Sequence, residues 1–136
     1  MRDPLRDIVE AILEIYSEKL LYVSILNATR QPSLMNDVEL LIVVESYNSN
    51  DILNEQSAIR KKVLEKTGIC IEPYLYSIDD ICMIFRSRKL MLAILGGIVP
   101  IYQDSRFNMR GVLCECSYSA GESSGYVDVV RNLLCS

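Results

Sequence analysis

The sequence contains no histidine. Histidine is the usual general base of serine and cysteine hydrolases and the commonest metal ligand, so its absence excludes Ser-His-Asp and Cys-His catalysis. A long hydrophobic run is also lacking, because the nearly uncharged segment 90–101 is shorter than the ~20 residues that span a bilayer. The first residues are charged and do not form a signal peptide. We therefore expect a cytoplasmic protein with no membrane partner.

The chain also lacks a net positive charge. Its formal charge of −4 argues against general nucleic-acid binding. The five cysteines form an odd set without a secretory context, which predicts reduced thiols rather than a disulfide framework. Cys114 and Cys116 do not have the spacing of a structural zinc site, so idle or buried thiols are predicted there.

A chain of 136 residues is long enough for one domain with a hydrophobic core. Asp3 followed by Pro4 is typical of a helix start, and Asp51 and Gly68 enclose a second helical segment. Helices are predicted at 3–19, at 51–66, in a stretch that starts at 78–81 and ends before the basic residues 86–89, at 90–95 and at 125–134. Strands are predicted at 20–26, 36–45, 69–76, 98–102 and 112–118. These elements predict a mixed α/β (α+β) fold with a small twisted sheet of four or five strands flanked by helices. The main domain is placed at 1–104, and residues 105–136 form an extension that packs on it or forms an interface.

The segment 36–45 combines two acids with a run of apolar, mostly β-branched residues, which predicts a buried strand. Asp37 and Glu39 are two positions apart and would project from the same side of that strand. Their mutual repulsion favours a cation between them, and oxygen ligands of this kind suit Mg²⁺ or Mn²⁺. The alternative is a strand whose entrance is merely acidic and solvated.

A third acid, Glu72, lies in the otherwise apolar segment 69–76. Its carboxylate must reach solvent, a partner or a metal, because burying it unpaired is costly. Pro73 next to it predicts an edge strand or a bulge. The basic residues 60–62 and 86–89 are interpreted as solvated surfaces, with phosphate contacts as the alternative.

Four features occur in a recognisable order: Ser24 near the end of a strand, the acidic segment 36–40, Glu72 on a later strand, and a closing segment 97–102 with the sequence GIVPIY. In this order and spacing the chain, from about residue 20 to about residue 103, resembles the minimal nucleotidyltransferase domain of the DNA polymerase β superfamily. That domain is found in MNT-like proteins that occur beside HEPN partners.

The resemblance implies transfer of a nucleoside monophosphate from a nucleoside triphosphate to a hydroxyl acceptor. It implies that Asp37, Glu39 and Glu72 are the catalytic residues and hold Mg²⁺ (or Mn²⁺), in two-metal chemistry that needs no protein nucleophile. It further implies that Ser24 and Arg30 contact the triphosphate. The partner it implies is a HEPN-like protein, with a homo-oligomer as the alternative.

The chain departs from the family pattern at three places. Val23 replaces a glycine that lets the backbone approach phosphates. Glu39 and Glu72 replace aspartates, and Arg30 is the only arginine of its loop. Three alternatives therefore stay open: an active nucleotidyltransferase, a catalytically impaired fold kept as a binding or regulatory antitoxin-like subunit, and an unrelated α/β domain.

Overall fold

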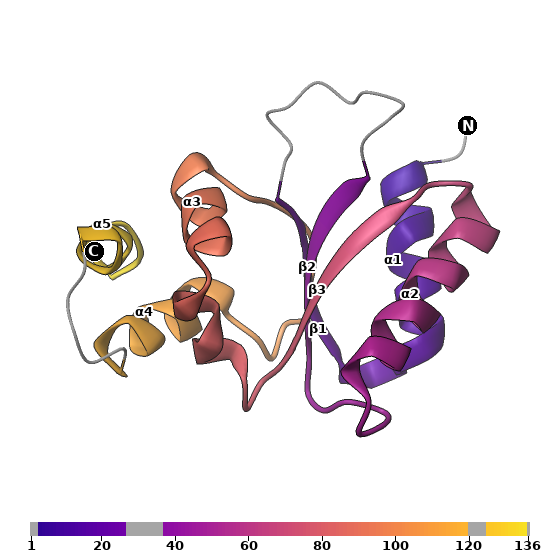
Figure 1. Ribbon diagram of the computed structural model, residues 1–136, viewed down its shortest axis with the longest axis horizontal. Coiled ribbons are helices and arrows are strands. Elements are labelled where there is room, and N and C mark those ends of the chain that lie inside the picture. Colours follow the sequence, from indigo (N-terminus) through magenta and orange to yellow (C-terminus); the bar gives the residue numbers. More distant parts are fainter. Residues whose placement is uncertain (1–2, 27–36, 120–124, 136) are drawn as a thin grey trace.

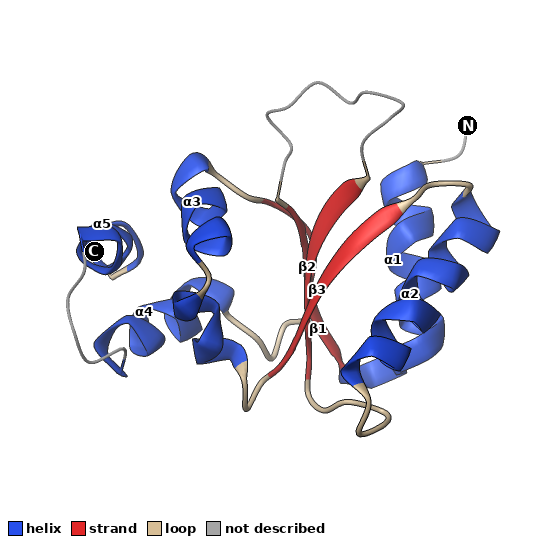
Figure 2. Cartoon of the chain, viewed as in Figure 1, coloured by secondary structure: helices blue, strands red, loops and turns tan. Residues whose placement is uncertain are grey.

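The fold is a four-stranded mixed sheet with helices on both faces (Figures 1 and 2). The computed structural model describes residues 3–26, 37–119 and 125–135. The strands are β1 (Leu20–Ile25), β2 (Val38–Val44), β3 (Ile71–Ser77) and β4 (Val99–Gln103), in the order β3-β2-β1-β4. Strand β1 is antiparallel to β2 and β4, and β2 is parallel to β3. The predicted fold class is confirmed, and β3, which contains Pro73, is an edge strand as predicted.

One face of the sheet is covered by α1 (Pro4–Tyr16) and α2 (Ile52–Thr67), which pack side by side (Figure 1). The Asp3 carboxylate caps α1 by accepting a hydrogen bond from the Leu5 N–H, and Asp51 caps α2 in the same way. Gly68 ends α2 with a left-handed backbone, φ 74°, which glycine adopts without strain. Both helices therefore start and end where the sequence predicts, within a few residues.

The opposite face is covered by the second half of the chain (Figure 1). The helices there are α3 (Arg88–Gly96), α4 (Met109–Ser119) and α5 (Gly125–Leu134), and the 3₁₀ segment Ile81–Arg86 precedes α3. A second 3₁₀ segment, Ser17–Lys19, joins α1 to β1.

The two faces bury two separate hydrophobic clusters. The helix-pair core contains Ile8, Ala11, Ile12, Tyr16, Leu20, Val23, Leu40, Ile42, Val44, Ile59, Val63, Ile71 and Leu75. The C-terminal core contains Leu21, Tyr22, Leu26, Leu41, Val43, Ile81, Ile84, Leu90, Met91, Ile94, Phe107, Met109, Leu113, Cys116 and Val130. Consecutive residues of β2 alternate between the two, as successive strand side chains must. The segment after residue 104 thus shares a core with the sheet.

The predicted strand at 112–118 is wrong, because these residues belong to helix α4. The helix buries Met109, Leu113 and Cys116, a spacing of four and three residues that follows the helical period. The Asn108 side chain accepts a hydrogen bond from the Gly111 N–H and so satisfies one of the first helical amides. The predicted helix at 125–134 is confirmed.

The prediction of reduced thiols is also wrong for four of the five cysteines. Cys82 is bonded to Cys116 and Cys114 to Cys135, with sulfur–sulfur distances of 2.04 and 1.99 Å. Cys70 alone keeps a thiol, and it is exposed. One bond joins the 3₁₀ segment Ile81–Arg86 to α4, and the other joins α4 to the residue that follows α5. The pairing of the cysteines thus depends on contacts between distant segments, which the spacing of cysteines along the chain does not reveal.

No helix within the described ranges is both long enough and apolar enough to cross a membrane.

We expect the protein to lose stability in alkali, in part through Tyr16. Burial of the Tyr16 phenol, with the charge of Glu55 nearby, raises its pKa well above the ordinary value. A group whose folded pKa is raised stabilises the fold below its unfolded pKa, about 10 for tyrosine, and this stability is lost as the pH rises above that value. The free energies of unfolding of Tyr16→Phe and wild type, measured in urea, should therefore be closer to each other at pH 7 than at pH 11. At pH 11 the variant should be the more stable protein. An equal loss in both proteins would contradict this role for Tyr16.

Candidate functional site

The candidate site is centred on two glutamates of adjacent strands. Glu39 of β2 and Glu72 of β3 are direct partners in the parallel register. Direct partners on neighbouring strands point to the same face, and the alternation along β2 places Glu39 on the side of Leu41, which belongs to the C-terminal core. The structure therefore brings together, on the α3 side of the sheet, two acids that the sequence predicts to act together.

Ser24 lies on the same face, because it is the direct partner of Leu41 in the antiparallel pair of β1 and β2. It is fully buried, and its hydroxyl makes no hydrogen bond of ordinary geometry with the described residues. The hydroxyl does lie close enough to that of Tyr22 to lower the pKa of this phenol, although burial raises it by more. A buried hydroxyl without a hydrogen-bond partner is uncommon. At a candidate site such a hydroxyl is available to hydrogen-bond a polar atom of a ligand.

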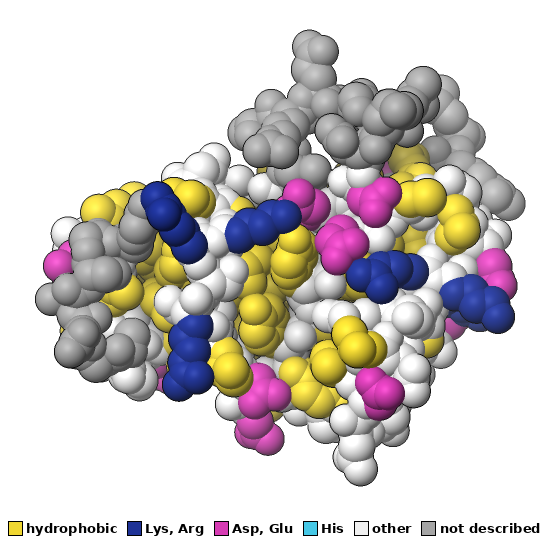
Figure 3. Space-filling view, in the orientation of Figure 1, with side chains coloured by type: hydrophobic (Ala, Val, Ile, Leu, Met, Phe, Trp, Pro, Cys, Tyr) yellow, Lys and Arg dark blue, Asp and Glu magenta, His cyan; other side chains and the backbone are white. Residues whose placement is uncertain are grey.

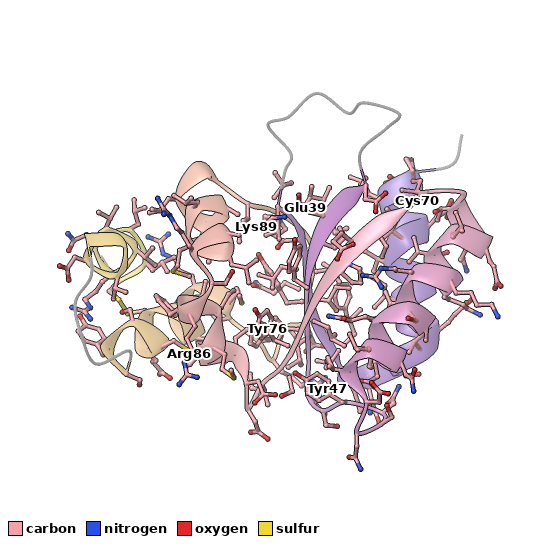
Figure 4. The ribbon with its side chains drawn as sticks, viewed as in Figure 1. Glu39, Tyr47, Cys70, Tyr76, Arg86 and Lys89 are labelled. Atoms are coloured by element: carbon pink, nitrogen blue, oxygen red, sulfur yellow. A yellow bond between two sulfur atoms is a disulfide. The ribbon has the colours of Figure 1, made fainter. Side chains whose placement is uncertain are left out.

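Glu39 is held by a lysine that the sequence analysis did not connect with it. The Lys89 ammonium of helix α3 lies 3.2 Å from the nearer Glu39 oxygen, and Figure 4 shows the two side chains meeting at one end of the sheet. The ammonium also lies 5.2 Å from the centre of the Tyr74 ring. Hydrogen bonding to Tyr74 and the charge of Glu39 raise the pKa of Lys89, so the lysine stays protonated at neutral pH.

Glu72 is held by a cation from the other side of the sheet. Arg60 of α2 reaches it at the β3 edge, where a guanidinium nitrogen lies 3.1 Å from a carboxylate oxygen. Both side chains remain about two-fifths exposed, so the pair contributes little to stability. Lys62, from the same basic group, bridges Glu14 of α1 instead. The group thus makes specific ion pairs at a surface that the sequence suggested was only solvated.

The remaining predicted site residues are Asp37 and Arg30, which come between β1 and β2 in the sequence. Asp37 is exposed, directly precedes β2 and stands two residues before Glu39. Arg30 lies outside the described residues. Figure 3 shows acidic side chains gathered near the middle of the visible face with basic side chains beside them. The charge of this surface is therefore mixed.

The predicted metal site can be tested against this geometry. Three carboxylates are a suitable donor set for Mg²⁺ or Mn²⁺. Within residues 3–26, 37–119 and 125–135, however, no three side chains from histidine, cysteine, aspartate and glutamate lie together in a way that could hold a metal ion. Glu39 and Glu72 are turned toward basic groups instead. In this arrangement the acids do not fit a metal ion held by all three.

Lys89 and Arg60 are the site residues that sequence reasoning missed. Both lie in basic groups whose positive charge is visible in the sequence. Which acids they pair with depends on how α2 and α3 pack against the sheet. The residues around Lys89 and Arg60 in the sequence do not indicate this packing.

Comparison of the chain with protein-family models, curated proteins and solved structures finds no match.

Proposed function

We propose that this protein has a nucleotidyltransferase-like fold and acts as a binding or regulatory subunit. In this proposal the charges of Glu39 and Glu72 are neutralised by basic side chains of the same chain. The observation that supports the proposal is the pairing of Glu39 with Lys89 and of Glu72 with Arg60. The two acids stand in register on neighbouring strands, as a shared site requires, yet each has a basic side chain of this chain as its counter-ion.

The residue types support the same proposal. The family resemblance places a glycine where this chain has Val23, which is fully buried and belongs to the helix-pair core. A β-branched side chain there serves packing, whereas the glycine would serve the approach of backbone to phosphate. Glutamate in place of aspartate moves each carboxylate outward by roughly one bond length, ~1.5 Å, in chemistry that is sensitive to displacements of about 1 Å.

The second candidate function is an active nucleotidyltransferase, which transfers a nucleoside monophosphate to a hydroxyl with the help of Mg²⁺. The specific observation in its favour is that Ser24, Glu39 and Glu72 share one face of the sheet. For this function the ion pairs of Glu39 and Glu72 must open before the acids are available to a metal ion.

Titration calorimetry separates the two candidates. Mn²⁺, and then ATP in the presence of Mn²⁺, is titrated into wild type, Asp37→Ala and the control Asp79→Ala, which removes an exposed acid outside the site. For a binding or regulatory subunit we expect no Mn²⁺-dependent ATP binding at millimolar ligand in any of the three proteins. Binding that disappears in Asp37→Ala and persists in Asp79→Ala would favour the active enzyme and contradict the first proposal.

The same Asp37→Ala protein tests whether this acid is structural. Asp37 is exposed and stands two residues before the acid Glu39, so its removal should leave the free energy of unfolding within about 0.5 kcal/mol of wild type or raise it. Urea unfolding measures the difference. Leaving a buried polar group without its partner costs about 1–3 kcal/mol. A loss of stability of about 2 kcal/mol or more would therefore show that Asp37 supports the fold.

The partner belongs to the proposal, because the fold does not identify it. A regulatory subunit of this kind would bind a HEPN-like protein or a second copy of the chain. A cytoplasmic location stays a prediction, and the two disulfides remove the argument for it that rested on reduced thiols.

A further inference from the structure

We propose that the protein binds a small ligand with a primary ammonium group, in a cavity between the end of helix α1 and the start of helix α2. The cavity has a volume of about 200 Å³, and its lining includes Tyr16 of α1 and Glu55 of α2. The juxtaposition that carries the proposal is that of two buried oxygen atoms, the Tyr16 hydroxyl and Glu55 Oε2, which make no hydrogen bond with any described residue. Figure 1 shows the two helix ends together at one end of the molecule. Glu39 and Lys89 lie at the other end of the sheet, so this is a separate site (Figure 4).

Both side chains are almost completely enclosed by the protein. Tyr16 is 2% exposed and Glu55 is 6% exposed. A buried polar atom without a hydrogen-bond partner is costly, and the cost is larger for a charged group because desolvation penalises the charge. Burial and the charge of Glu55 raise the pKa of Tyr16 above its ordinary value, so the phenol keeps its proton at neutral pH. The cavity thus offers one carboxylate oxygen and one neutral hydroxyl to a ligand.

Glu55 is held in place through its other carboxylate oxygen. Oε1 accepts hydrogen bonds from the backbone N–H groups of Asn48 and Ser49, in the loop that precedes α2. Asp51 is the N-cap of α2, so Glu55 lies near the positive end of the helix dipole, which favours a carboxylate. The backbone therefore fixes the carboxylate and leaves Oε2 for a donor from outside the chain.

The chemistry of these two oxygens favours an ammonium ligand. A carboxylate oxygen only accepts hydrogen bonds, so the ligand must be a donor. A charged donor forms shorter and stronger bonds to a carboxylate than a neutral one does, and a primary ammonium has three N–H groups, enough for both oxygens. Tyr16 is also the last residue of α1, where the negative end of the helix dipole favours a cation. Ile15 and Ala58 line the same cavity and can contact a short hydrocarbon tail.

Lys19 limits the charge that the ligand can carry. Its ammonium hydrogen-bonds the side chain of Asn48, which lines the cavity, and lies 6.0 Å from the centre of the Tyr16 ring. One ligand ammonium is compensated by the charge of Glu55, whereas a second would be repelled by Lys19. We therefore expect a ligand with one ammonium group and an uncharged or anionic remainder.

The test is a titration followed by the backbone amide NMR signals of Asn48 and Ser49, because these amides bond to Glu55. The probes are n-propylammonium chloride, n-propanol as a neutral molecule of the same length, and the diammonium salt of the same hydrocarbon chain. Sodium chloride at equal ionic strength is the control for salt effects. We expect saturable shifts at millimolar n-propylammonium, weaker binding of the diammonium salt, and no saturation with n-propanol or sodium chloride.

Two variants assign the binding to the two oxygens. Glu55→Gln keeps Oε1 for the loop amides and removes the charge, so the affinity should fall by about tenfold or more, which corresponds to about 1.4 kcal/mol. Tyr16→Phe keeps the ring and removes the hydroxyl, and the loss of one hydrogen bond should weaken binding by about threefold or more. Glu65→Gln is the matched control, because it makes the same change at an exposed position of α2. It should bind as wild type does.

A wild-type protein that shows no saturable binding of n-propylammonium would mean that the cavity holds water only, and would overturn the proposal. Equal affinities of wild type and Glu55→Gln would overturn it as well, once the unfolding midpoint in urea has shown that the variant is folded. If Glu55→Gln does not fold, Tyr16→Phe decides in the same way. Diammonium binding as tight as that of n-propylammonium would contradict the single charge. These results leave the proposed function untouched, because Glu39 and Glu72 lie outside the cavity.

Discussion

Removal of the two disulfides should cost this protein a large part of its stability. The bonds join cysteines that are 34 and 21 residues apart, Cys82 to Cys116 and Cys114 to Cys135. Cross-links of this span restrict the unfolded chain, and the chain-entropy relation gives about 3–4 kcal/mol for each. Natural domains are stable by only about 5–15 kcal/mol. Urea unfolding with and without reductant should therefore show a marked fall in the unfolding midpoint.

The cysteine variants identify which bond is responsible. Cys82→Ala with Cys116→Ala removes one bond, Cys114→Ala with Cys135→Ala removes the other, and Cys70→Ala is the control, because Cys70 is exposed and unbonded. Reductant should have no effect on a protein that lacks both bonds. A thiol reagent should find one thiol in the native protein and five after reduction and unfolding. Five reactive thiols before reduction would contradict both disulfides.

Two neighbouring leucines of β2 should each contribute about 2–5 kcal/mol to the free energy of unfolding, because each is buried in a different core. Leu40 and Leu41 are both completely buried, and they point to opposite faces of the sheet. Leu40 belongs to the helix-pair core and Leu41 to the C-terminal core. Replacing a buried leucine with alanine removes apolar contacts and leaves a cavity, at a cost of about 2–5 kcal/mol. We expect a loss in this range for each variant, measured by urea unfolding.

Leu53→Ala is the control for this pair, since Leu53 is 69% exposed on α2. A surface substitution of this kind should change the free energy of unfolding by no more than about 0.5 kcal/mol. If Leu40→Ala were costly and Leu41→Ala were not, the helices after β3 would contribute little to the folded state. Two costly substitutions would show that the sheet needs a core on each face.

The candidate site was only partly predictable from the sequence. The parallel pairing of Glu39 with Glu72 could be expected, because a helix joins their strands and such connections favour parallel neighbours. The cations that hold these acids could not, since Lys89 is on a helix of the second half and Arg60 reaches around an edge strand. Ion pairs of this kind depend on the packing of whole elements.

Local chemistry in the sequence determined several elements of this protein, although it predicted a strand where the structure has helix α4. A capping aspartate before α1 and α2, a glycine after α2 and a β-branched run in β2 each act through neighbouring residues, so their effect can be predicted without knowing the fold. Tertiary structure alone decided that four of the five cysteines are paired and that Lys89 lies against Glu39. The physical reason is that both depend on distances between segments far apart in the chain, which only the packing of helices on the two faces of the sheet sets.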